Sequence, residues 1–101
     1  MKTYKIRIKQ NALTDIQEIT DWYNRQKPGL GKRFQNTTIE QINSLNHHAF
    51  SYAIRYNEFR CMIIKGFPYM VHFYINESSN NVEIYAVIST SRNPKIWLEE
   101  L

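Results

Sequence analysis

The sequence contains a single cysteine, Cys61, so no disulfide can form within the chain. This cysteine falls in an apolar stretch, where we expect it to be buried as a small hydrophobic side chain. No stretch approaches the roughly 18 apolar residues that a membrane-spanning helix needs. Residues 1–10 alternate basic with apolar side chains, unlike the continuous apolar core of a signal peptide. These absences predict a cytoplasmic protein.

The sequence also lacks the common motifs of metal and phosphate chemistry. His47 and His48 are adjacent and therefore diverge in regular structure, and no other histidine, cysteine or carboxylate cluster has ligand spacing. Gly29 and Gly31 are neither preceded by a predicted strand nor followed by the Lys-Ser/Thr pair of a phosphate-binding loop. No serine lies in a strained-turn motif of the kind that presents a nucleophile. We therefore expect neither a metal nor a cofactor.

The overall composition is that of a globular protein with a mild excess of positive charge. Hydrophobic residues make up 43% and charged residues 22% of the 101 residues, which predicts one domain spanning residues 1–101. Aromatic residues reach 14%, enough for a core and a recognition surface. The formal net charge of +4 favours nucleic acid, an enzyme acting on it or an acidic peptide as a partner. The same charge also fits a basic domain with no anionic partner.

The first half of the chain predicts one strand and two helices. Residues 3–9 alternate apolar and basic side chains, which is typical of a half-buried strand. Asn11 can cap a helix that stops before Pro28, with Trp22 and Tyr23 expected in the core. The apolar stripe of this helix is Leu13, Ile16, Ile19 and Tyr23. A second helix over about residues 30–45 shows one shared face, made of Leu30, Phe34, Thr38, Ile42 and Leu45.

The second half of the chain changes to the period of two that marks strands. Strands are predicted over residues 59–65, 69–76 and 82–89, and residues 93–101 form a tail anchored by Trp97. We expect the core side of the last two strands to carry Tyr69, Val71, Phe73, Ile75, Val82, Ile84, Ala86 and Ile88. The other side is either the working surface or a face shielded by the tail, and it carries Met70, His72, Tyr74, Glu83, Tyr85 and Val87.

This order of elements predicts an α+β fold. The N-terminal strand and a two-helix hairpin pack on one face of an antiparallel sheet, which the N-terminal strand can join, and a short C-terminal tail follows.

The sequence also holds the side chains that metal-free RNA cleavage requires, namely an acid, a base and cations for the phosphate. Candidate cations are Arg60, Lys65, Arg92 and Lys95. Candidate acids and bases are Glu58, His72 and Glu83. Tyr74 and Tyr85 are candidates for stacking on bases. Residue spacing alone does not bring these groups to one point, and a charged side chain on a strand is more often simply solvated.

Several short motifs, in this order and spacing, resemble one protein family over nearly the whole chain. In the helical half they are Asp15-Ile16, Trp22-Tyr23, Pro28-Gly29-Leu30-Gly31 and Arg33-Phe34. In the strand half they are Arg60 ahead of Phe67-Pro68-Tyr69, then Ala86-Val87-Ile88, Ser91-Arg92-Asn93-Pro94 and Trp97. Together they are similar to the RelE/ParE superfamily of toxins, and to its ParE-like branch in particular.

The resemblance implies the toxin component of a bacterial type II toxin–antitoxin module. Members inhibit growth, and a cognate antitoxin neutralises them by wrapping an extended or helical segment over the toxin. The ParE-like branch inhibits DNA gyrase and is not known as a nuclease. The RelE-like branch cuts mRNA in the ribosomal A site. The implied target is therefore DNA gyrase for a ParE-like chain, and the ribosome with its mRNA for a RelE-like chain.

Particular positions favour the ParE-like, non-nuclease branch. Met70 stands where RelE carries a strand arginine, and only Arg92 matches the arginine after the last strand. Ser89 stands where related ParE-like chains often carry a histidine. The target-binding residues implied are Arg60, Tyr74, Tyr85, Arg92 and Trp97. If the chain is instead a ribosome-dependent mRNA endoribonuclease, the candidate catalytic residues are Arg60, His72, Tyr85 and Arg92.

Overall fold

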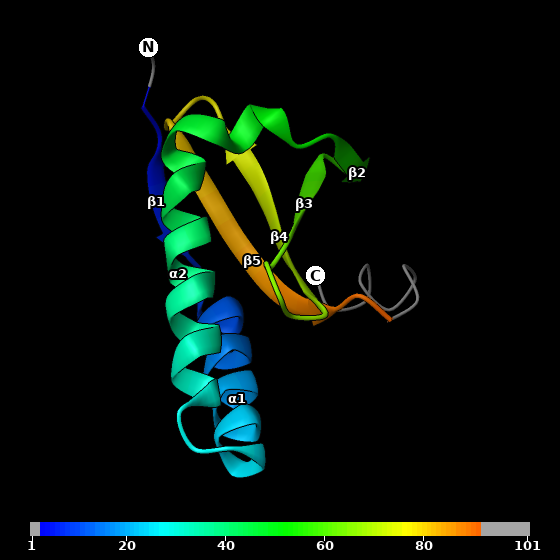
Figure 1. Ribbon diagram of the computed structural model, residues 1–101. Coiled ribbons are helices and arrows are strands. Elements are labelled where there is room, and N and C mark those ends of the chain that lie inside the picture. Colours follow the sequence, from blue (N-terminus) through cyan, green and yellow to red (C-terminus); the bar gives the residue numbers. More distant parts are fainter. Residues whose placement is uncertain (1–2, 92–101) are drawn as a thin grey trace.

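The structure, a computed structural model, describes residues 3–91 of the chain (Figure 1). One strand and two helices come first, and a short 3-10 helix and four strands follow. The elements are β1 (Lys5–Ile8), α1 (Gln10–Gln26), α2 (Leu30–His48), η1 (Ala49–Ser51), β2 (Ile54–Tyr56), β3 (Phe59–Ile63), β4 (Tyr69–Asn76) and β5 (Asn81–Ser89). The predicted α+β class, with two consecutive helices near the N-terminus, is confirmed.

The strands form one mixed sheet in the order β1-β5-β4-β3-β2. Strands β2 to β5 pair antiparallel, which confirms the prediction for β3, β4 and β5. Strand β1 joins this sheet but runs parallel to β5, in a register that aligns Lys5 with Asn81 and Ile8 with Ile84. The expectation of a purely antiparallel sheet is therefore wrong at this edge. The helical hairpin between β1 and the rest of the sheet is long enough for the crossover that a parallel pair requires.

Strand β2 was not predicted, because three residues are too few to show a period. It forms a two-residue hairpin with β3 in which Tyr56 pairs with Phe59. The two turn residues, Asn57 and Glu58, have positive φ values of 39° and 68°. Both central residues of a type I′ turn need such values, and this turn matches the twist of the flanking strands. Asn57 suits that conformation, whereas Glu58 holds a position that usually carries glycine.

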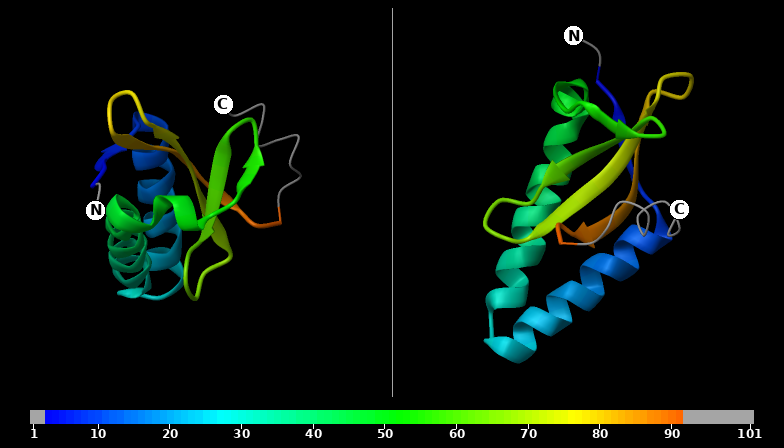
Figure 2. Two further views of the ribbon diagram at one scale, coloured as in Figure 1. Left: turned by 90° about the horizontal axis from the view of Figure 1, so that it is seen from above. Right: turned by 90° about the vertical axis from the view of Figure 1, so that its right-hand side faces the viewer.

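The two helices form a hairpin on one side of the sheet; they lie close together at their connection and diverge towards their other ends (Figure 2). Gly31 makes the close approach possible, since a Cβ atom there would lie 2.1 Å from the backbone oxygen of Thr20. The side chain of Asn24 then accepts a hydrogen bond from the Gly31 N–H at 2.8 Å. Gly29 precedes α2 in the left-handed region, with a φ of 92°. The Pro-Gly-Leu-Gly segment is thus the joint that folds α2 back along α1.

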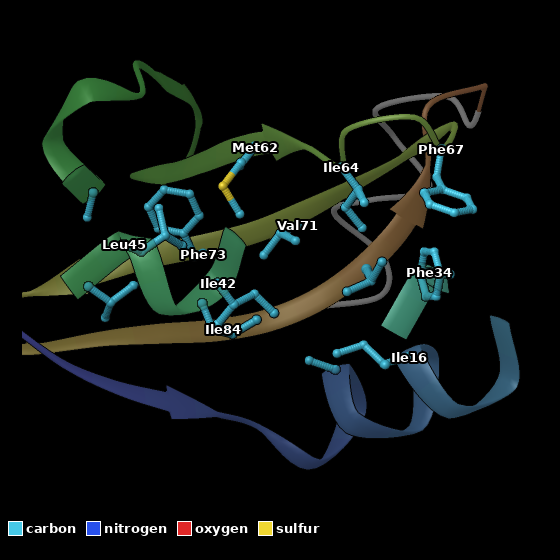
Figure 3. Close-up of a cluster of buried hydrophobic side chains, with 14 of the residues drawn as sticks. Ile16, Phe34, Ile42, Leu45, Met62, Ile64, Phe67, Val71, Phe73 and Ile84 are labelled. Atoms are coloured by element: carbon cyan, nitrogen blue, oxygen red, sulfur yellow. The ribbon is translucent and has the colours of Figure 1, made fainter. Parts of the chain in front are cut away.

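The main core lies between the helices and the facing side of the sheet (Figure 3). Helix α2 buries Phe34, Thr38, Ile42 and Leu45, which confirms the face predicted for it. The sheet contributes Met62, Val71, Phe73, Val82, Ile84 and Val87, and Ile64 joins them from the connection that follows β3. Burying so many large apolar side chains stabilises the fold through the hydrophobic effect.

The buried face of α1 differs from the predicted stripe. Ala12, Ile16 and Thr20 are buried, whereas Leu13 is 45% exposed and Trp22 is 47% exposed. The predictions that Leu13 and Trp22 lie in the core are therefore wrong. The Thr20 backbone lies against Gly31 of α2, whereas the side chains of Leu13 and Trp22 are turned outward.

A bulge in β5 reverses the predicted alternation of side chains along its second half. Phe73 of β4 pairs with Ile84 and His72 with Ala86, so Tyr85 is one extra residue on β5. An extra residue shifts every later side chain to the opposite face. Val87 therefore enters the main core, and Ala86 and Ile88 lie on the other face, in a second buried cluster. The predicted placements of these three side chains are wrong.

Candidate functional site

The sheet face turned away from the helices is the candidate site, and we call it the tyrosine face. Its members are Tyr56, Phe59, Cys61, Met70, His72, Tyr74, Glu83, Tyr85, Ala86 and Ile88. The centre of this face is buried and is not a free working surface. Cys61, Met70, Ala86 and Ile88 form a buried cluster in which no side chain exceeds 9% exposure. The accessible part of the face includes the half-buried aromatic rings and Ile63, which pairs with Met70 and is 62% exposed.

Three aromatic rings meet at one end of the tyrosine face. The ring centroids of Phe59, Tyr74 and Tyr85 lie 5.1–5.7 Å apart. Tyr56 stacks on Phe59 with an interplanar angle of 18°. Tyr85 lies at the bulge of β5, on the same face as Tyr74, as the alternation of side chains predicts. Half-buried aromatic rings of this kind present an apolar surface with hydroxyl groups at its rim, which suits a protein partner or a stacked base.

The hydroxyl of Tyr85 is uncharged at neutral pH. Burial raises the pKa of Tyr85 above its ordinary value of 10.0, and the hydrogen bond with Tyr74 adds to the effect. Tyr85 therefore supplies a neutral hydrogen-bonding group rather than a phenolate base.

Glu83 is buried on the same face, with 5% exposure, and is held by Lys9. The Lys9 ammonium lies 3.2 Å from the Glu83 carboxylate and 5.8 Å from the centre of the Tyr85 ring. Both charges of the pair are thus engaged with each other and with the aromatic cluster. A buried carboxylate is costly unless a cation compensates its charge. The Lys9–Glu83 ion pair therefore holds the Lys9 side chain in place on this face.

His72 is fully enclosed within the tyrosine face. Its Nδ1 atom lies 2.6 Å from the Tyr56 hydroxyl and 3.4 Å from Cys61 Sγ. Burial, followed by the positive charge of Arg55, lowers the pKa of His72 from 6.5 to about 4. The imidazole is therefore neutral at pH 7, and its hydrogen bond with Tyr56 ties the edge strand β2 to the central strand β4.

Cys61 is a buried free thiol. Burial raises the pKa of Cys61 from 9.0 to about 11. The side chain is therefore a thiol at neutral pH and is unsuited to act as a nucleophile, which needs the thiolate.

Arg60 lies apart from the tyrosine hydroxyls, on the helix side of β3. It pairs across the strands with Phe73, a residue of the main core. Its guanidinium donates a hydrogen bond to the backbone oxygen of Tyr52 and lies 5.2 Å from the centre of the Phe50 ring. The predicted set Arg60, Tyr74 and Tyr85 is thus divided between two sides of the sheet. Arg92, Lys95 and Trp97 lie outside the described residues.

A groove between α1 and β5 is a feature that the sequence did not indicate. Strand β1 pairs with β5 only as far as Ile84, so within residues 3–91 the rest of β5 pairs with β4 on one side and has no strand on the other. Asp15 of α1 fills part of this gap by accepting a hydrogen bond from the Val87 N–H at 2.9 Å. The cavity that remains has a volume of about 490 Å³ and is lined by Asn11, Asp15, Glu18, Ile19, Tyr69, Ala86, Val87, Ile88 and Ser89.

The residues that the structure describes contain neither a cluster of metal ligands nor a membrane-spanning helix. Residues 3–91 bring no three histidine, cysteine or carboxylate side chains together as metal ligands. Neither helix in this range has the length and apolar character that crossing a membrane requires.

The fold is shared with toxins of toxin–antitoxin modules. A chain of the chromosomal ParDE system from P. aeruginosa is similar with a TM-score of 0.77 and 17% identity, over 88% of this chain and 98% of that one. The E. coli toxin RelE, in a mutant free form, gives a TM-score of 0.72 and 10% identity, over 97% and 94% of the two chains. A chain of the RelBE2 toxin–antitoxin complex from Mycobacterium tuberculosis is similar with a TM-score of 0.63 and 15% identity, over 86% of this chain and 98% of that one. At these identities the likeness establishes the fold alone.

The family follows from the sequence itself. Residues 6–94 match the family described as the ParE toxin of the type II toxin–antitoxin system parDE, and the chain belongs to that family. No curated protein sequence matches the chain. The resemblance to the RelE/ParE superfamily, ParE-like branch, is thereby confirmed.

Proposed function

We propose that this chain inhibits bacterial growth by binding DNA gyrase in the cytoplasm, and that a cognate antitoxin neutralises it. Membership of the ParE toxin family supports the toxin role. The similar chains from P. aeruginosa and M. tuberculosis come from a toxin–antitoxin system and a toxin–antitoxin complex, which supports an antitoxin as partner.

The observation that carries the choice of target is the chemistry of the tyrosine face. Cutting RNA without a metal needs an accessible acid and base and cations around the phosphate. On this face His72 is enclosed and neutral, and Glu83 is paired with Lys9. Met70, which stands where RelE carries an arginine, is a buried apolar side chain. Such a surface is suited to recognition of a protein through its aromatic cluster rather than to nuclease chemistry.

A ribosome-dependent mRNA endoribonuclease is the alternative function. The aromatic cluster of Phe59, Tyr74 and Tyr85 favours it, because such rings can stack on unpaired bases. The candidate catalytic residues remain Arg60, His72, Tyr85 and Arg92, of which the first two lie on different sides of the sheet.

The antitoxin is proposed to bind an open sheet edge, with a helical segment in a groove as a second mode. Strands β1 and β2 form the two edges of the sheet and offer backbone groups for strand addition. Lys5 and Arg7 are exposed on β1, so an acidic antitoxin segment fits this edge.

Gyrase and mRNA cleavage can be separated with purified components. The full chain should inhibit supercoiling of a relaxed plasmid by gyrase without ribosomes, and it should leave ribosome-bound mRNA intact. The double variant Tyr74→Ala/Tyr85→Ala should lose inhibition, whereas Leu13→Ala, which removes an exposed apolar side chain elsewhere, should keep it. Codon-positioned mRNA cuts with unchanged supercoiling would favour the endoribonuclease instead. Retention of both variants by the co-expressed antitoxin is the control for folding.

A further inference from the structure

The excess positive charge of the chain is concentrated in one segment. Between Asp21 and Glu40 the sequence has no acidic residue but four basic ones, at Arg25, Lys27 and the pair Lys32–Arg33. The whole chain has 13 basic and 9 acidic residues, for a net charge of +4. These four cations equal the entire excess, and the rest of the chain is balanced.

The structure gathers these cations where α1 turns into α2. We call the residues Trp22, Arg25, Lys27, Lys32 and Arg33 the hairpin tip. All five are exposed. The connection between the two helices projects beyond the end of the sheet, at the bottom of Figure 1 and again in the right-hand view of Figure 2. The hairpin tip is therefore a convex, basic end, well separated from the tyrosine face.

The charges at the hairpin tip are not neutralised within the described part of the protein. The ion pair that residues 3–91 form is Lys9–Glu83, and no tip cation takes part in one. Arg33 packs its guanidinium 5.8 Å from the centre of the Phe67 ring, which leaves its charge uncompensated. Four unpaired cations at one end of a small protein produce a local positive potential that attracts anions.

Folding alone does not explain two of these cations. Lys32 and Arg33 are the third and fourth residues of α2, whose first turn holds no acidic residue and whose N-cap gives no side-chain hydrogen bond. The start of a helix carries partial positive charge, so acidic side chains stabilise it and basic ones destabilise it. A local arrangement that costs stability is a common mark of a functional surface.

We propose that the hairpin tip binds the phosphate backbone of duplex DNA. Two adjacent helices of about 10–12 Å diameter each cover roughly 20 Å. Along that length duplex DNA presents about a dozen phosphates, roughly twice as many as a single strand. The compact group of cations therefore matches the duplex best. Trp22 lies three residues before Arg25 on the same side of α1, where its exposed ring adds apolar contact for the sugar–phosphate chain.

The proposal is tested by fluorescence polarisation of a labelled 20-base-pair duplex with the full chain in 50–200 mM NaCl. The double variant Lys27→Gln/Lys32→Gln removes two tip charges. It should weaken binding at least about tenfold at 50 mM NaCl, and it should reduce the slope of log K against log salt by about 1.8. The matched control Lys5→Gln/Arg7→Gln removes two exposed cations from β1 and should change the affinity less than about twofold, because β1 lies away from the α1–α2 connection (Figure 1).

Other outcomes overturn the proposal. An equal loss of DNA affinity in the two double variants would mean that binding depends on the net charge of the protein and not on the hairpin tip. Absence of binding by the wild-type chain at 50 mM NaCl, or equally tight binding of a polyglutamate peptide, would also reject it. The melting temperature of Lys32→Gln should stay the same or rise, so a loss of DNA binding by this variant cannot come from unfolding. Gyrase inhibition is measured separately, so failure of either proposal leaves the other standing.

Discussion

The carboxylate of Asp15 on α1 accepts a hydrogen bond from the backbone N–H of Val87 on β5, 72 positions away in the sequence, at 2.9 Å. A helix side chain thus takes the place of a missing neighbouring strand, because β1 ends before it can pair with this part of β5. The bond also fixes α1 against the bulged half of β5, whose side chains complete both the core and the tyrosine face.

Removing this carboxylate should destabilise the fold. We expect Asp15→Ala to lower the free energy of unfolding by about 2 kcal/mol, because a hydrogen bond to a charged group is lost and a strand N–H is left unpaired. Asp15→Asn keeps an acceptor oxygen and should cost less than about 1 kcal/mol. Urea unfolding followed by circular dichroism measures both values. Glu18→Ala, in the same groove, is the control, and an equal loss in that variant would show that Asp15 has no special role.

The turn between β2 and β3 predicts a stabilising substitution. Glu58 has a φ of 68°, a conformation that costs a non-glycine residue about 1 kcal/mol. Glu58→Gly should therefore raise the free energy of unfolding by roughly 0.5–1 kcal/mol. The control is Glu77→Gly in the β4–β5 loop, a residue without a positive φ, and it should lower stability. A destabilised Glu58→Gly would mean that the carboxylate makes a contact worth more than the backbone strain.

His72 makes the stability of the protein depend on pH. Its pKa falls from 6.5 to about 4 on folding, so the unfolded chain binds more protons between these values. The stability from the neutral imidazole is complete above pH 6.5 and is lost as the pH falls towards 4, by roughly 3 kcal/mol in all. The measurement is the free energy of unfolding at several pH values between 7 and 4.5.

His72→Gln isolates this contribution, because the variant cannot titrate in that range. Its stability should fall less steeply with decreasing pH than that of the wild-type chain, although it starts lower at pH 7. Parallel curves for the two proteins would contradict the buried, neutral state of the imidazole.

The joint of the helical hairpin predicts a strongly destabilising substitution. In Gly31→Ala the new Cβ atom would lie 2.1 Å from the Thr20 backbone oxygen, so the helices must move apart. We expect a loss of at least about 2 kcal/mol in thermal or urea unfolding. Gly66→Ala is the matched control: no atom lies within 4 Å, and only the φ of +83° opposes it, at about 1 kcal/mol. A smaller loss at Gly31 than at Gly66 would refute the close approach of α1 and α2.

The candidate site was predictable only in part. Period-two alternation placed His72, Tyr74 and Tyr85 on one sheet face, and the structure has them there. The same rule failed after Tyr85, because a bulge depends on how β5 pairs with β4 and has no local signal in the sequence. The burial of His72 and the placement of Arg60 on the other side of the sheet also depend on neighbours distant along the chain.

The local elements and the family could be inferred from the amino-acid sequence alone. The helical spacing of Phe34, Ile42 and Leu45 and the Pro-Gly joint are local, because hydrophobic periodicity and backbone preference act over a few residues. The parallel pairing of β1 with β5 and the burial of the centre of the tyrosine face became clear from the folded chain. So did the collection of the excess charge at the hairpin tip. These features arise from pairing and packing between distant segments, which short-range patterns do not encode.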